Sequence, residues 1–198
     1  MTTICIVRHG ETDWNAQKRF QGREDIQLNE KGKEQARIVA NYLKKSEWHI
    51  IVSSPLKRAS MTAEIIGEYL GVSEIMTSDA FIERDFGEAS GMTLEQQKIA
   101  FLDGTIPGKE NDDVLADRVI RGLDFLVKEN EGKNIIVISH GAVINVLLKH
   151  ISNNSINIGE TLIKNTCVNI IKYIDNKWQI ELYNSVDYKT TPIDIEMF

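Results

Sequence analysis

The chain has 198 residues, of which 42% are hydrophobic and 26% charged, a composition typical of a globular protein with a sizeable core. Its formal net charge of −6 disfavours general binding to nucleic acids or anionic membranes, because both require a positive field. No apolar run reaches the length of a membrane span and no secretory signal peptide is visible, so we expect a cytoplasmic protein without a membrane or nucleic-acid partner.

The length of the chain limits the number of domains, and its cysteine content limits the number of disulfides. We expect a single domain over residues 1–198, with an insert at about 78–112. Cys5 and Cys167 both fall in predicted strands, where a thiol behaves as a small hydrophobe. Two such cysteines do not form a disulfide framework, which agrees with a reducing, cytoplasmic setting.

The first predicted element is a strand over residues 4–7, which is a continuous apolar run typical of a strand buried on both faces. The run stops at Arg8, His9 and Gly10. In open α/β sheets, ligands bind beyond the carboxyl ends of the strands. We therefore expect Arg8 and His9 to lie at a ligand-binding crevice.

The next elements alternate between helix and strand. The polar stretch 13–29 predicts an ordered loop rather than regular structure, and Asn29 is expected to cap a helix that follows it. A second apolar run at 49–52 predicts a strand. Ser54, followed by proline, is expected to cap the next helix, which ends at Gly71.

The middle of the chain gives weaker signals. A third short strand is expected at about 74–76, and the insert at 78–112 is expected to lie over the crevice, with a short helix near 93–102. Either Asp112 or Asp113 can cap the long helix that follows, because both can accept a hydrogen bond from a free N–H of its first turn.

A second copy of the strand–His–Gly pattern lies at residues 135–141, where a predicted strand ends at His140 and Gly141. A helix over 142–150 and a hairpin of strands 167–174 and 178–183 complete the expected elements. This order predicts an α/β fold, a three-layer α/β/α sandwich with a mostly parallel central sheet and an antiparallel margin.

The strand ends bring together two arginines, two histidines and a backbone N–H, contributed by Arg8, His9, Arg58, His140 and Gly141. Paired guanidinium groups beside a helix N-terminus form an anion site, and phosphate is the anion that best matches the fork of arginine. Each residue alone has a more ordinary interpretation, such as a strand-end ion pair or a solvated charge. Their convergence at one sheet edge favours a phosphate site.

Phosphoryl transfer also needs a nucleophile and a proton donor. His9 is the candidate nucleophile, provided that its imidazole is neutral and its other nitrogen donates to a fixed acceptor, which the sequence does not identify. Glu83 is the candidate acid, because a neighbouring phosphate dianion would favour its protonated form. No cluster of carboxylates has metal-ligand spacing, so the arginines and His140 could take the place of a metal.

Several motifs resemble, in their order, those of the histidine phosphatase superfamily, in its phosphoglycerate-mutase-like branch. They are Arg8–Thr12 followed by Trp14 and Asn15, Phe20–Gly22, Leu28–Gly32, Ser53–Ala59 and Ser139–Gly141. The tripeptide Arg-His-Gly alone is a weak signal, whereas the ordered set over residues 4–141 is a strong one.

The resemblance implies a phosphoglycerate-mutase-like fold and a phosphohistidine formed on His9 and then hydrolysed. It implies that Glu83 is the proton donor and that no metal or cofactor takes part. It also assigns roles to the other site residues: Arg8, Arg58 and His140 hold the phosphoryl group, and Asn15, Gln21, Gly22 and Gly141 contribute to substrate binding. A structural or lid role is implied for Glu110.

Three functions remain open at this point. The segment 92–113 is short and acidic, with only Lys98 and Lys109 as bases, which favours a phosphatase of small-metabolite phosphomonoesters over a phosphoglycerate-type mutase. The third function is that of a non-catalytic protein that binds a phosphate ligand on the same fold. The expected partner is a small phosphate ester, and an exposed sheet margin would allow a homodimer.

Overall fold

The computed structural model describes residues 1–156, 158–159 and 162–189. Its sheet has six strands in the order β3-β2-β4-β1-β5-β6. The strands are β1 (Thr2–Arg8), β2 (Ile50–Ser53), β3 (Ile75–Thr77), β4 (Asn134–Ser139), β5 (Val168–Ile174) and β6 (Lys177–Ser185). Strands β1 to β4 are parallel to one another, whereas β5 is antiparallel to both of its neighbours, β1 and β6.

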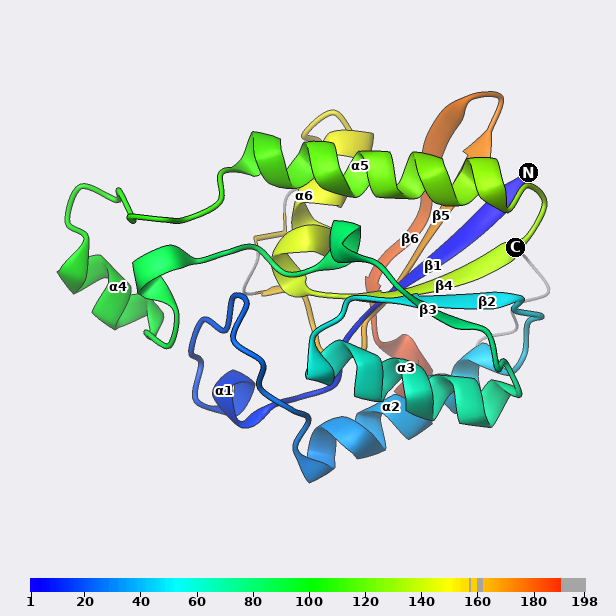
Figure 1. Ribbon diagram of the computed structural model, residues 1–198, viewed down its shortest axis with the longest axis horizontal. Helices are drawn as coiled ribbons and strands as arrows, with labels where there is room; N and C mark the ends of the chain where they lie inside the picture. The colour runs from blue at the N-terminus through cyan, green and yellow to red at the C-terminus, as the bar shows by residue number, and fades with distance from the viewer. Residues whose placement is uncertain (157, 160–161, 190–198) are drawn as a thin grey trace.

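Helices cover both faces of this sheet (Figure 1). They are α1 (Asp13–Ala16), α2 (Glu30–Leu43), α3 (Lys57–Leu70), α4 (Leu94–Ala100), α5 (Asp112–Glu129) and α6 (Gly141–Ile151), with short 3-10 turns at η1 (Asp79–Phe81), η2 (Gly87–Ala89) and η4 (Asp187–Lys189). Helices α2 and α3 pack on one face and α5 and α6 on the other, while α4 extends to the side (Figure 1).

Strand β4, at the centre of the sheet, contributes side chains to the core on both faces. Ile135 and Val137 of β4 point into the core beneath α5 and α6, whereas Ile136 and Ile138 point into the core beneath α2 and α3. A continuous apolar run is needed because each face of the strand meets its own layer of helices. The predicted three-layer α/β fold is therefore confirmed.

Local signals at several helix and strand ends are confirmed. The Asn29 side chain accepts a hydrogen bond from Gly32 N at 2.8 Å and caps α2. Gly71 ends α3 in the left-handed conformation, with φ of 70°. Asp175 and Asn176 form the β5–β6 turn with φ of 49° and 60°, as expected of a two-residue hairpin turn.

Three other local predictions were wrong. The stretch 13–29 contains the single-turn helix α1, stabilised by a capping box between Thr12 and Asn15. Helix α5 is capped by Asn111, which accepts from Val114 N at 2.8 Å, because both aspartates already lie inside the first turn. Ser54 does not cap α3, since the helix begins three residues later and the Ser54 hydroxyl instead contacts His140.

In the part of the chain that the structure describes, no helix combines the length and the apolar character needed to cross a membrane.

Candidate active site

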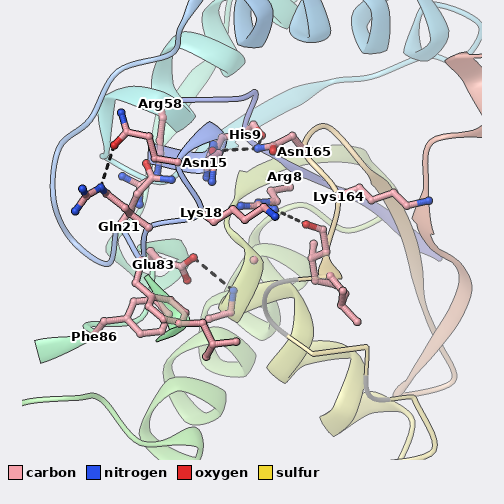
Figure 2. A pocket seen from close by; sticks show the side chains of 18 of the residues that line it. Arg8, His9, Asn15, Lys18, Gln21, Arg58, Glu83, Phe86, Lys164 and Asn165 are labelled. Atoms are coloured by element: carbon pink, nitrogen blue, oxygen red, sulfur yellow. Dashed lines mark hydrogen bonds between the residues drawn. The ribbon is translucent and has the colours of Figure 1, made fainter. Parts of the chain in front are cut away.

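The two His-Gly strand ends meet at the centre of the sheet. Strands β1 and β4 are paired so that Arg8 lies opposite Ser139, and His9 N donates to Ser139 O at 3.0 Å. The rings of His9 and His140 lie 5.1 Å apart between centroids. A cavity of about 960 Å³ opens at this edge, and its wall includes Arg8, His9, Arg58 and Glu83 (Figure 2).

The His9 side chain is oriented by a backbone carbonyl. Its Nδ1 lies 2.6 Å from Gly10 O, and because a carbonyl can only accept, Nδ1 carries the proton and Nε2 keeps its lone pair. Burial, followed by the positive charges of Arg58 and Arg8, lowers the pKa of His9 well below its usual value of 6.5. The imidazole is therefore neutral, with Nε2 available as a nucleophile.

The backbone at Gly10 is fixed by the helices beneath it. A Cβ on Gly10 would lie 2.3 Å from Gly32 O of α2, so only glycine permits this approach. Gly10 N donates to Thr62 Oγ1 of α3 at 3.1 Å. Helices α2 and α3 thus hold the peptide whose oxygen orients His9.

Arg58 is fully buried in the first turn of α3. Its Nη1 donates to Glu24 O and its Nη2 to Gly22 O, both at 2.7 Å, and its Nε has no partner among the described atoms. Burial is the main cause that lowers the pKa of Arg58 to about 10. The guanidinium still carries its charge at neutral pH.

Arg8 approaches the cavity from the end of β1. Its Nη1 donates to Ile163 O, and its Nε, like that of Arg58, has no partner in the described residues. Neither arginine forms an ion pair with a carboxylate of the described chain at 4.0 Å or less. Two buried or half-buried guanidinium groups without a carboxylate form a site suited to an oxyanion.

His140 is fully buried and lies directly before α6. Its Nε2 contacts Ser54 Oγ at 2.7 Å, while its Nδ1 is buried without a partner among the described atoms. Burial, then the positive charge of Arg58, lowers the pKa of His140 well below 6.5. The serine that was expected to cap a helix instead orients this histidine.

Glu83 reaches the cavity from the segment that follows η1 (Figure 2). Its Oε1 accepts from Arg84 N at 2.8 Å, and its Oε2 lies 3.4 Å from Ala142 N in the first turn of α6. Only 7% of Glu83 is exposed. The carboxyl group thus lines the same cavity as Nε2 of His9, on a different wall.

The remaining expected residues have different positions. Asn15, Gln21 and Gly141 line the cavity. Gln21 Oε1 accepts from Thr12 Oγ1 at 3.0 Å, which holds it beside α1. Gly22 does not line the cavity. Its carbonyl accepts a hydrogen bond from Arg58 and so helps to hold that guanidinium in place.

Asn165 is a site residue that the sequence reasoning missed. Its Nδ2 donates to His9 O at 3.1 Å and to Asn15 Oδ1 at 3.3 Å. It precedes β5, and because β5 is antiparallel to β1, the start of β5 lies at the same edge as the end of β1. The position of Asn165 directly before the predicted hairpin is the sequence signal that points to it.

The outer wall of the cavity combines two segments far apart in the sequence. Residues 17–20 follow α1, and residues 93–95 belong to the expected insert. Backbone hydrogen bonds join them: Phe20 N donates to Met92 O at 2.9 Å and Gly91 N to Phe20 O at 2.8 Å. Lys18 and Arg19 bring positive charge to this outer region and Glu95 brings negative charge, while the Lys164 side chain extends away from the cavity (Figure 2).

Two buried neutral histidines give the stability of the protein a pH dependence. Below about pH 6.5 the unfolded chain binds protons at His9 and His140 that the folded protein does not, so the free energy of unfolding falls as the pH drops. Each contributes up to about 1.4 kcal/mol per pH unit. We expect urea midpoints to decrease from about pH 7 to about pH 5, with a shallower dependence in His140→Gln. A midpoint that does not change over this interval would contradict the neutral, buried state of both rings.

Among the described residues, no group of three or more His, Cys, Asp or Glu side chains has an arrangement that could hold a metal ion.

Comparisons with known proteins show what this chain is similar to. The family model of the histidine phosphatase superfamily (branch 1) matches residues 4–186. The uncharacterized phosphatase PhoE of Bacillus subtilis is 44% identical over 184 residues, covering 93% of this chain and 95% of that protein. The metal-independent phosphoserine phosphatase of Arabidopsis thaliana is 35% identical over 201 residues, covering 95% and 83%.

Solved structures of phosphoserine phosphatases are also similar to this chain over most of its length. A phosphoserine phosphatase from Entamoeba histolytica in complex with 3-phosphoglyceric acid aligns with a TM-score of 0.80 and 29% identity. The alignment covers 95% of this chain and 99% of that one. A mutant of a phosphoserine phosphatase from the same organism, in complex with phosphoserine, also aligns with a TM-score of 0.80, at 28% identity.

Proposed function

This chain belongs to the histidine phosphatase superfamily (branch 1) and is a phosphomonoesterase, and we propose that it hydrolyses phosphomonoesters of small metabolites without a metal, through a phosphohistidine on His9. The observation that carries the proposal is the state of His9. Its Nδ1–H is held by Gly10 O, and its neutral ring lines a cavity shared with Glu83 and two arginines. A site that only binds phosphate has no need for a fixed, neutral nucleophile.

In the first step, His9 Nε2 attacks the phosphorus atom of the ester. The P–N bond forms as the bond between phosphorus and the leaving oxygen breaks, and Glu83 gives its proton to that oxygen. Arg8, Arg58 and His140 surround the phosphoryl oxygens and stabilise the charge that they carry in the transition state. The Nδ1–H···Gly10 bond stabilises the positive charge that develops on the imidazole.

In the second step, water replaces the alcohol. The Glu83 carboxylate takes a proton from the water as its oxygen attacks phosphorus, and the P–N bond breaks. Inorganic phosphate leaves, His9 is neutral again, and Glu83 is protonated for the next ester.

The outer cavity favours esters that carry a second anionic group. Its volume of about 960 Å³ accommodates more than the transferred phosphoryl group. Lys18 and Arg19 belong to the outer wall, where they can attract a carboxylate. Phosphoserine and 3-phosphoglycerate, which occupy the Entamoeba histolytica structures, are therefore the first metabolites to test.

Phosphate release from an activated aryl phosphate, in excess chelator and at mildly acidic to neutral pH, tests the proposal. We expect the same turnover of the aryl phosphate with and without chelator. In a second assay, we expect turnover of the carboxylated metabolite esters. Activity that disappears in chelator and returns with a metal would contradict the metal-free mechanism. If the product is an isomerised ester and no free phosphate appears, the protein is a mutase, and ligand-induced stabilisation without turnover would identify a phosphate-binding protein.

A further inference from the structure

We propose that Arg118 and Glu110 are positioning residues that set the place of Glu83 and thereby determine its efficiency as the proton donor. This inference rests on the proposed function. Neither residue lines the cavity, and both form hydrogen bonds with the backbone of the segment that carries Glu83.

Arg118, from α5, connects three separate groups. Its Nε and Nη2 bind the two oxygens of Glu110 at 2.8 and 2.9 Å, which is a bidentate pair. Its Nη1 donates to Ala80 O at 3.0 Å, and its Nη2 also donates to Glu83 O at 3.3 Å. The Arg118 guanidinium thus holds the backbone carbonyl of Glu83, the proposed proton donor.

Glu110 holds the next two residues of the same segment. Its Oε2 accepts from Asp85 N at 3.3 Å, its backbone N donates to Asp85 O at 2.8 Å, and its backbone O accepts from Arg84 Nη1 at 3.1 Å. Burial raises the pKa of the Glu110 carboxyl, but Arg118, the Asp85 N–H and Arg23 together keep the pKa below its usual value. The Glu110 carboxyl is therefore ionised at neutral pH.

The Glu83 carboxyl depends on this backbone more than on neighbouring side chains. Its two hydrogen bonds come from backbone N–H groups, of Arg84 and Ala142. Residues 82–85 belong to no helix or strand, so no regular hydrogen-bond ladder fixes them. A shift of Arg84 N moves the carboxyl relative to the leaving oxygen, and misplacement by about 1 Å can cost about 100-fold in rate.

The test compares Arg118→Gln and Glu110→Gln with Arg121→Gln. Arg121 lies on the same helix, is exposed, and pairs with Asp117 at 2.9 Å, so the same substitution there leaves the Glu83 segment unchanged. We expect kcat for an alkyl phosphate to fall about 10- to 100-fold in the first two variants. Turnover of an activated aryl phosphate, whose leaving group needs no proton, should fall far less, and Arg121→Gln should match wild type on both.

A double variant separates positioning from general damage. In the Glu83→Gln background, Arg118→Gln should add no further selective loss on the alkyl phosphate, because the proton donor is already absent. Equal losses on both esters, or an undiminished alkyl-selective loss in the double variant, would overturn the inference. Arg118→Lys, which keeps the charge but loses the fork, gives the same comparison if Arg118→Gln does not fold. Wild-type turnover and its dependence on Glu83 are measured separately, so failure of this inference leaves the proposed function intact.

Discussion

His9→Ala is expected to lower turnover of every phosphate ester by at least about 10⁴-fold, because no other side chain can replace a buried, oriented nucleophile. Phosphate should still bind, because Arg8, Arg58 and His140 remain. Turnover can be measured by phosphate release and binding by competitive inhibition or calorimetry. The covalent intermediate can be trapped during turnover by quenching in alkali, where phosphohistidine is stable, and located by mass spectrometry.

His150→Ala is the matched control for this variant. His150 is exposed near the end of α6, and its side chain forms no hydrogen bond or ion pair with the described residues. It should retain wild-type turnover and the trapped intermediate. Retention of turnover in His9→Ala, or a phosphorylated residue other than His9, would refute the proposed nucleophile.

Glu83→Gln is expected to lower turnover of alkyl phosphates by about 10²- to 10⁴-fold and to affect activated aryl phosphates far less. Glutamine has nearly the same shape and its Oε1 can still accept from Arg84 N, but an amide cannot supply a proton to the leaving oxygen. A plot of log kcat against the pKa of the leaving group should therefore become steeper in the variant.

Glu88→Gln makes the same substitution five residues further along the same segment, at an exposed position. Its plot should coincide with that of the wild type. If Glu83→Gln slows alkyl and aryl esters equally, Glu83 is not the proton donor, and its contribution is to the shape or the charge of the cavity.

The sheet and its central strands were predictable because their signals are local. Apolar runs at 4–7 and 135–138 indicated doubly buried strands, and the shared His-Gly ending indicated a shared edge. Strands β1 and β4 are indeed neighbours, with Arg8 opposite Ser139. Because side-chain pattern and strand direction together determine where a parallel strand ends, this part of the site follows from the sequence.

The groups that orient these side chains were not predictable, because many of them are backbone atoms. Gly10 O orients His9, and the carbonyls of Gly22 and Glu24 hold Arg58. Every residue has a backbone carbonyl, so the residue type does not indicate which carbonyl will orient a site side chain. Ser54 illustrates the related problem that one hydroxyl has several possible partners, and long-range packing against His140 decided between them.

The outer wall of the cavity combines a fixed backbone with replaceable side chains. Main-chain hydrogen bonds between Phe20 and residues 91 and 92 fix its course, whereas Lys18, Arg19, Leu94 and Glu95 are exposed. Substitutions at exposed positions usually change the free energy of unfolding by less than about 0.5 kcal/mol. Mutation can therefore exchange the groups that meet the substrate at little cost in stability and without touching His9 or Glu83. This separation makes the protein a suitable starting point for the evolution of new substrate preferences around an unchanged reaction.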